Sequence, residues 1–268
     1  MTGLSIERVL ARDRWIVAGC VALIAGVAWI WLWRQSLTMS AVDHSMAGMD
    51  MPGMDMGGGA MASPAGPVAY IGGAFIMWFI MMIAMMLPSA SPMILLYARL
   101  ARGAREQGAA IAPTVVFVGM YLAVWAGFSA IVAIAQWLLV RSGAVSDMSL
   151  ALGDRRIAGG LLIAAGLYQA TALKRACLDN CRSPLSFVMR LWRPGWAGAA
   201  RLGLIHGVYC LGCCAALMVL LFVFGVMNLV WVAALALFVL IEKILCVGQR
   251  VVVGSGIALI LAGLIMIF

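Results

Sequence analysis

Long uncharged stretches alternate along the chain with short segments that carry lysine and arginine. A helix needs about 20 consecutive apolar residues to cross the hydrocarbon core of a bilayer. Stretches near or above this length occupy residues 15–33, 69–98, 113–140, 157–173, 202–241 and 251–268. The 40 residues of 202–241 would form one helix of about 60 Å, about twice the core thickness, so we expect this stretch to fold back at residues 225–228. The pattern predicts an all-α, polytopic membrane helix bundle with about seven transmembrane helices.

The distribution of basic residues predicts how this bundle is oriented. If the N-terminus is inside, 14 of the 18 lysine and arginine residues fall in cytoplasmic segments and 4 fall outside. Cytoplasmic loops of membrane proteins carry an excess of lysine and arginine, so the pattern favours an N-in/C-out topology. Residues 15–33 exceed the apolar part of a signal peptide and end without a small-residue cleavage site, so we expect a retained anchor.

The composition agrees with a membrane protein. The chain is 65% hydrophobic and 10% charged, whereas ordinary soluble domains are about 45–50% apolar and about 25% charged. A single soluble domain is therefore excluded, and insertion explains the formal charge of +8 without a nucleic-acid partner. We expect three regions: an N-terminal transmembrane anchor helix over 1–34, a Met/Gly-rich extracytoplasmic loop over 35–68, and a six-helix metal-binding membrane domain over 69–268.

The predicted outer loop is rich in methionine. It holds seven methionines within residues 39–61, mixed with glycine, proline and aspartate. Thioether sulfurs are soft ligands that select Cu(I) over hard cations, and silver would bind in the same way. The alternative is a low-complexity linker whose methionines are incidental. The expected ligands for soft-metal capture in this loop are His44, Met46, Met49, Met51, Met54 and Met56.

A second group of methionines lies in the predicted second helix. At the helical period, Met77, Met81 and Met85 fall within an arc of about 80°, whereas Met82 and Met86 fall off it. Methionine is also an ordinary apolar filler with adaptable packing. For Met77, Met81 and Met85, a row of metal ligands and ordinary apolar packing therefore remain equal alternatives.

The uncharged stretch that begins at residue 202 carries the most specific cluster. His206, Cys210, Cys213 and Cys214 project from one face of the predicted helix. A single cysteine is often just a small buried hydrophobe. Three cysteines within five residues, one turn from a histidine, favour a metal site instead, because thiolates and imidazole suit Cu(I) or zinc.

The predicted fold-back adds two residues to this cluster. It places Glu242 at the depth of Cys213 and brings Cys246 near the same group. An ionisable residue inside a span is costly and by default indicates function. We expect Lys243 to reach the nearby cytoplasmic surface with its long side chain, and Glu242 to pair across helices with His206 or with a bound cation.

Two more cysteines lie just inside the predicted cytoplasmic face. Cys177 and Cys181 form a C-x₃-C pair among four basic residues. This environment favours reactive thiols and suits either metal transfer or disulfide exchange. The alternative is two surface thiols that the cytoplasm keeps reduced. Cys20, alone in the first predicted helix, is assigned to packing.

Several motifs in the sequence resemble a bacterial family described as predicted metal-binding integral membrane proteins, a domain of unknown function. The resemblance covers roughly residues 70–250 and implies a metal-binding fold in the bacterial inner (cytoplasmic) membrane, in contact with the lipid bilayer. The Met-rich run is similar to segments of periplasmic copper-resistance proteins. The stretches that carry the family resemblance are residues 77–88, 166–184, 207–214, 225–228 and 242–243.

Three functions remain open at this point. The first is a non-catalytic Cu(I)-binding protein for copper capture, delivery or transport, with a copper chaperone, a cuproenzyme or other membrane subunits as partners. A primary pump is not expected, because the sequence has no G-x-x-x-x-G-K-[ST] motif. The second is a membrane thiol–disulfide oxidoreductase in which the cysteine pairs exchange electrons. The third is an accessory subunit whose helices contact partners through Gly159, Gly160, Gly254 and Gly256.

Overall fold

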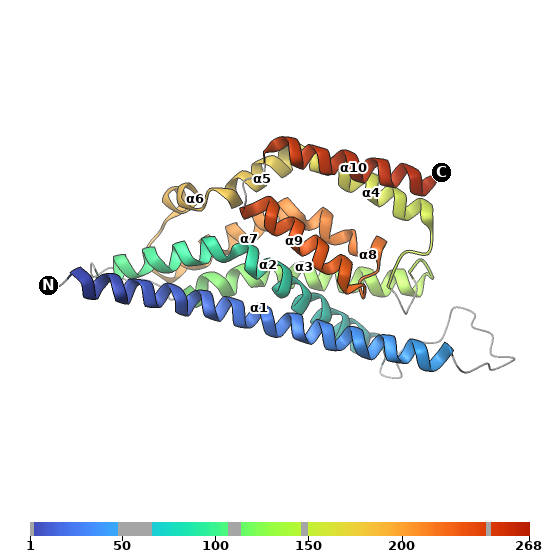
Figure 1. Ribbon diagram of the computed structural model, residues 1–268, viewed down its shortest axis with the longest axis horizontal. Coiled ribbons are helices and arrows are strands. Elements are labelled where there is room, and N and C mark those ends of the chain that lie inside the picture. Colours follow the sequence, from blue (N-terminus) through green and yellow to red (C-terminus); the bar gives the residue numbers. More distant parts are fainter. Residues whose placement is uncertain (1–2, 48–65, 107–113, 146–149, 245–247) are drawn as a thin grey trace.

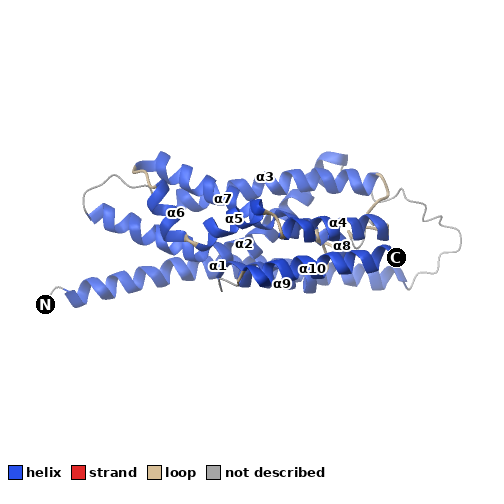
Figure 2. Cartoon of the chain, turned by 90° about the horizontal axis from the view of Figure 1, so that it is seen from above, coloured by secondary structure: helices blue, strands red, loops and turns tan. Residues whose placement is uncertain are grey.

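The computed structural model describes residues 3–47, 66–106, 114–145, 150–244 and 248–268. Within these residues every regular element is a helix, as the sequence predicts, and there is no strand. The helices form an elongated bundle with the N-terminus and the C-terminus at opposite ends (Figure 1, Figure 2). In chain order they are α1 (Gly3–Ala47), α2 (Gly66–Glu106), α3 (Thr114–Arg141), α4 (Arg155–Gln169), α5 (Ala172–Arg182), α6 (Pro184–Leu191), α7 (Gly195–Val219), α8 (Leu221–Phe224), α9 (Leu229–Ile244) and α10 (Gln249–Ile267).

Five helical segments are long and apolar enough to cross a membrane. They lie in α1, α2, α3, the continuous stretch of α7 and α8, and α10. The pair α4 and α5 passes the same test together but is bent by 63°, so it is a sixth candidate. Helix α9 has 16 residues, about 24 Å, and is too short to cross alone. The described residues thus contain five to six candidate spans, where the hydrophobic pattern predicts about seven.

The first helix is longer than the anchor predicted over residues 1–34. Helix α1 continues to Ala47, into the segment that we expected to be loop, and α2 begins at Gly66. The reason lies in the sequence, because residues 35–47 contain neither proline nor glycine and Gly48 is the first helix-breaking residue after them.

The predicted fold-back at residues 225–228 is confirmed. Helix α8 ends at Phe224, and Gly225 has a φ of 87°, which glycine adopts without steric cost. The backbone N–H of Asn228 donates to the carbonyl of Gly225 at 3.0 Å, and α9 begins at the next residue. The 40-residue apolar stretch therefore divides into α7–α8 and α9.

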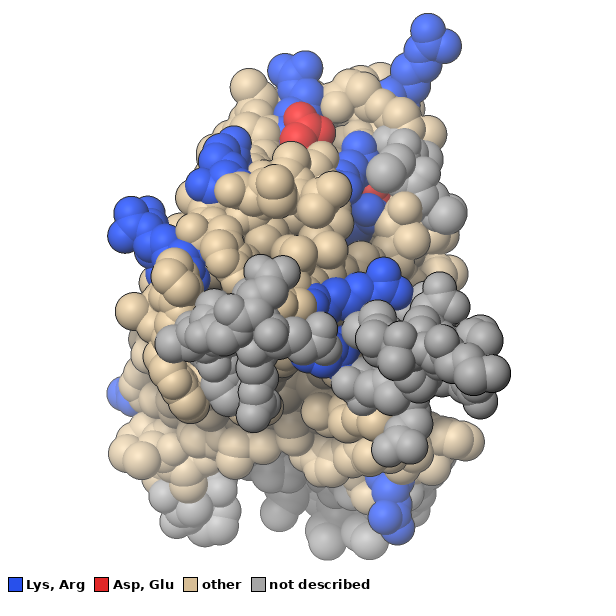
Figure 3. Space-filling view, turned by 90° about the vertical axis from the view of Figure 1, so that its left-hand side faces the viewer, with Lys and Arg blue, Asp and Glu red and all other residues tan. Residues whose placement is uncertain are grey.

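Basic side chains gather at the end of the bundle where the N-terminus lies. The space-filling view of this end shows lysine and arginine side chains on several elements and few acidic ones (Figure 3). An excess of basic side chains is what the positive-inside rule expects at a cytoplasmic face.

The core lies where α2, α3 and α7 meet. A Cβ on Gly203 of α7 would lie 2.2 Å from the carbonyl oxygen of Phe117, so only glycine lets α3 and α7 approach this closely. Helix α2 carries Pro88 and Pro92 in its interior. Each proline removes one backbone hydrogen bond, so α2 is weakened midway along its length, beside the cysteines of α7.

Helices α4 and α10 pack closely against each other through glycines. A Cβ on Gly166 would lie 2.5 Å from the carbonyl oxygen of Gly256, and one on Gly159 would lie 2.7 Å from that of Gly263. Gly159 and Gly256, expected to contact partner subunits, therefore make contacts within the chain. A Cβ on Gly160 would meet nothing within 4 Å.

We expect Gly166→Ala to weaken the contact between α4 and α10. The added methyl group forces the two backbones apart, and overpacking of this kind costs about 1–3 kcal/mol. Gly160→Ala is the matched control on the same helix, because its methyl group meets open space and alanine favours helix. Unfolding in a denaturing-detergent titration, followed by circular dichroism, should show a loss of stability for Gly166→Ala only. Equal stability of the two variants would contradict this packing.

Candidate metal centre

Three cysteines of α7 lie together in the core, on one helix face as predicted. Cys210, Cys213 and Cys214 are each at most 1% exposed. The thiols of Cys213 and Cys214 donate to the carbonyl oxygen of Cys210 at 3.1 and 2.8 Å. All three cysteines are free. The helix therefore presents three unoxidised sulfurs to its neighbours within one turn.

A fourth thiol reaches the same place from α5. Cys181 lies within hydrogen-bonding reach of Cys213. Its neighbour Cys177 packs on the α7 backbone, where a Cβ on Gly212 would lie 2.7 Å from the Cys177 sulfur. The sequence places the C-x₃-C pair and the α7 cysteines in two separate groups. The structure brings Cys181 to the α7 cysteines, and we call Cys181, Cys210, Cys213 and Cys214 the four-thiol cluster.

The helix α5 reaches the core because its sequence is amphipathic. It begins after the bend, where the Thr171 side chain accepts a hydrogen bond from the backbone N–H of Lys174 and so caps its N-terminus. Its buried face carries Lys174, Cys177 and Leu178. The hydroxyl of Tyr168 in α4 donates to the carbonyl of Gly212, which ties the preceding helix to α7.

A thioether of α2 also touches the four-thiol cluster. The Cys214 sulfur lies 3.7 Å from the sulfur of Met86, which is fully buried. Met77, Met81 and Met85 are also buried, but no contact between them and the cluster is seen in the described residues. The arc of Met77, Met81 and Met85 predicted from the sequence does not include Met86. Helix α2 packs against α1 on one side and α3 on another, so residues outside this arc are buried too.

Lys243 of α9 points into the four-thiol cluster, not to the surface as predicted. Its ammonium group lies 2.9 Å from the sulfur of Cys210, 3.9 Å from that of Cys214 and 3.3 Å from the hydroxyl of Ser89. The residue is 7% exposed, and no carboxylate of the described residues lies within ion-pair distance of it. The end of α9 packs against α2 and α5, which closes the route to the surface.

This contact has an electrostatic consequence. A buried ammonium group needs an anionic or strongly polar partner. The sulfur of Cys210 is its nearest partner, and the hydroxyl of Tyr121 lies 3.1 Å from the same sulfur. Lys243 and Tyr121 therefore both lie where they can donate a hydrogen bond to the sulfur of Cys210. In the sequence, Lys243 is noticeable as a charge just after the uncharged stretch 202–241, whereas nothing there indicates Tyr121.

Glu242 pairs with a partner other than the one predicted. Its carboxylate accepts hydrogen bonds from the ammonium group of Lys174 at 2.9 and 3.0 Å, and not from His206. Both residues are buried, and Gln169 accepts another hydrogen bond from Lys174. The guanidinium group of Arg182 donates to the carbonyl of Glu242 at 2.7 and 2.8 Å, which satisfies one of the last carbonyls of α9.

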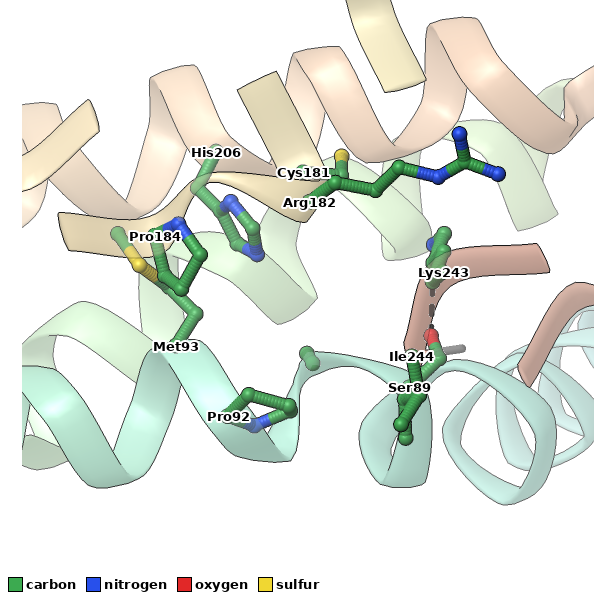
Figure 4. A pocket seen from close by; sticks show the side chains of 10 residues that line it. Ser89, Pro92, Met93, Cys181, Arg182, Pro184, His206, Lys243 and Ile244 are labelled. Carbon is green, nitrogen blue, oxygen red and sulfur yellow. Dashed lines mark hydrogen bonds between the residues drawn. The ribbon is translucent and has the colours of Figure 1, made fainter. Parts of the chain in front are cut away.

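His206 borders a cavity beside the four-thiol cluster. The cavity has a volume of about 220 Å³, and Met93, Cys181 and Lys243 also line it (Figure 4). The ring of His206 packs against aromatic rings at 5.5–6.0 Å, and its Nδ1 is buried with no hydrogen-bond partner among the described residues. The ring thus borders the cavity and has one nitrogen without a partner among the described residues.

The donors are close together but are not yet arranged around one point. No group of three or more His, Cys, Asp or Glu side chains has the geometry of a metal site in the part of the chain that the structure describes. The reason is visible at Cys213 and Cys214, whose thiols donate to the carbonyl of Cys210. Binding of an ion would require these side chains to rotate.

The remaining predicted ligands cannot be placed against this centre. Cys246 and four methionines predicted as ligands in the loop lie outside the described residues. His44 and Met46 fall on the last turns of α1, where the structure describes the backbone alone. The four methionines predicted as ligands that lie outside the described residues are Met49, Met51, Met54 and Met56.

Comparison with known proteins gives one match. A family model described as PpoB2, copper chaperone, matches residues 75–266. The matched region runs from within α2 to α10 and includes the whole four-thiol cluster, whereas the Met-rich segment lies outside it. No curated protein and no solved structure matches the chain.

We expect Lys174→Met to destabilise the protein by about 3–5 kcal/mol, because it leaves a buried carboxylate without its partner. The double variant Lys174→Met/Glu242→Met should recover most of the loss, since it replaces the ion pair with apolar side chains. Arg175→Met is the control, because Arg175 is the exposed neighbour on the same helix. Thermal unfolding in detergent measures all three. A double variant no more stable than Lys174→Met would contradict the pairing.

Proposed function

We propose that this chain, which belongs to the copper chaperone family, binds Cu(I) inside the bacterial inner membrane and delivers it to a copper enzyme. The observation that carries the proposal is the convergence of four thiols from α5 and α7 with a thioether from α2. Thiolate and thioether sulfurs are soft ligands that select Cu(I). The imidazole of the nearby His206 adds a further possible ligand, because its Nδ1 has no hydrogen-bond partner among the described residues.

The charges around the four-thiol cluster favour a monovalent ion. One Cu(I) ion held by two thiolates carries one net negative charge, and the ammonium group of Lys243 neutralises it. Zinc in a site of four thiolates would leave two negative charges for the same single ammonium group. Hard divalent cations are disfavoured further, because the carboxylate of Glu242 is already paired with Lys174. The proposed ligands are therefore sulfurs, with Lys243 as the charge partner.

The arrangement of the bundle supports a path for Cu(I) between the two membrane faces. The termini lie at opposite ends, and basic side chains gather at the N-terminal end (Figure 1, Figure 3). Both features support an N-in/C-out topology, with α9 as a short seventh crossing that its neighbours complete. In this topology the Met-rich segment is extracytoplasmic and captures Cu(I), with His44 and Met46 at its start.

A thiol–disulfide oxidoreductase is the second candidate. Cys181 and Cys213 come from two helices and lie within hydrogen-bonding reach of each other, and disulfide exchange needs two neighbouring thiols. This alternative explains the cysteines and a cation beside Cys210, but it gives no role to the contact between Cys214 and Met86.

Anaerobic purification, metal analysis and Cu(I) titration distinguish the two functions. We expect the wild-type chain to bind Cu(I) tightly and Cys213→Ser to bind it at least tenfold more weakly, a loss of about 1.4 kcal/mol. Cys20→Ser is the matched control, because Cys20 is exposed on α1 away from the cluster.

Two outcomes would contradict the proposed function. Equal Cu(I) affinity of the wild type and Cys213→Ser would remove the four-thiol cluster from the site. A wild type that binds no Cu(I) but forms a reversible disulfide between Cys181 and Cys213 would establish the oxidoreductase instead. A deletion of the Met-rich loop, titrated in parallel, separates binding in the loop from binding in the bundle.

A further inference from the structure

A second, smaller cavity is lined by three thioethers. Its volume is about 20 Å³, and the side chains of Met77, Met81 and Met227 face it. Met77 and Met81 lie one turn apart on α2 and are 8% and 1% exposed. Met227 comes from the turn between α8 and α9, far away in the sequence. Three soft ligands from two separate segments therefore meet around one empty space.

The size and the wall of this cavity restrict what it can hold. A volume of about 20 Å³ accommodates a single water-sized guest, which excludes an organic molecule. The cavity has no charged side chain in its lining, and the polar ones are Gln35 and Ser36 of α1. Carboxylates for a hard cation and cationic groups for an anion are both missing from this lining. A soft monovalent cation is the ion that neutral sulfurs suit.

We propose that Met77, Met81 and Met227 form a second metal site, which binds one Cu(I) or Ag(I) ion. Packing alone does not explain their arrangement, because methionine in a core usually fills gaps, whereas these three border one. Their flexible side chains can close around an ion. The site itself is independent of the cysteines, but its role in copper delivery rests on the function proposed above.

The position of this site connects it with the four-thiol cluster. Met77 and Met86 are nine residues apart on α2, about 14 Å along the helix axis. Met81, Met82 and Met85 lie between them, and each is at most 1% exposed. Buried thioethers therefore occur along α2 between the small cavity and Met86, which contacts Cys214.

Transfer along these thioethers needs ligand exchange alone. A Cu–S bond forms to the next thioether while a bond to the previous one breaks, and copper remains Cu(I) throughout. No electron moves, and the thioethers neither gain nor lose a proton. At the four-thiol cluster the ion exchanges a thioether for thiolates, and a thiol that binds it in place of its own proton releases that proton to water.

The site can be tested with Ag(I), a redox-stable probe, on the full-length protein. The background variant carries serine at the seven methionines of residues 39–61, so that the loop binds no ion. Equilibrium dialysis followed by elemental analysis counts bound Ag(I) per chain. We expect Met77→Leu/Met81→Leu/Met227→Leu to lose one Ag(I) relative to this background. Leucine conserves the volume of methionine, so the fold should persist.

The matched control replaces three methionines that line neither cavity, in Met120→Leu/Met189→Leu/Met218→Leu. It should bind as much Ag(I) as the background. A variant with serine at all four cysteines of the cluster should lose a different Ag(I), and combining both sets should remove both ions. Undiminished binding after the Met77, Met81 and Met227 substitutions would refute the second site. Undiminished binding after the cysteine substitutions would instead refute the proposed function and leave the second site standing.

Discussion

The contact between α5 and the end of α9 is the interaction on which the four-thiol cluster depends. Lys174 pairs with Glu242, and Arg182 caps the carbonyl of the same residue. Because Cys181 precedes Arg182 and Lys243 follows Glu242, these bonds hold a thiol and an ammonium group against α7. An ion pair inside an apolar bundle is costly to bury, and it is tolerated where each charge has a partner. Together with the hydrogen bonds from Arg182, it fixes the positions of α5 and α9 more tightly than apolar packing alone would.

Much of the fold follows from local rules that the sequence displays. The apolar stretches predict the helices, and Gly225 marks the fold-back, because a turn with positive φ there favours glycine. The number of crossings is harder to predict. Hydropathy measures length and polarity, and it cannot tell that residues 172–182 leave the axis of α4 by 63° and return to the core. The cluster joins two groups of cysteines because of that bend.

The sequence predicts only part of the candidate site, because the rest also depends on how the helices pack. A helical wheel identifies residues on one face, as it does for Cys210, Cys213 and Cys214, but it does not identify the helix opposite that face. The equal-depth argument for Glu242 assumes that α9 returns along α7, whereas α9 packs mainly on α2. The partners of Glu242 and Lys243 follow from that packing, which no local pattern in the sequence encodes.

The two sulfur-rich regions differ in charge, and this difference bears on how copper would move between them. Thioethers are neutral, so the small cavity can have an uncharged wall and needs no counterion until an ion arrives. Thiolates are anionic, so a buried thiolate site needs a cation, and Lys243 lies 2.9 Å from Cys210. An anionic ligand attracts Cu(I) more strongly than a neutral one, and more so in a medium of low dielectric constant. The free energy of the ion would therefore fall from the thioethers toward the thiols, which gives the path along α2 a direction without an external source of energy.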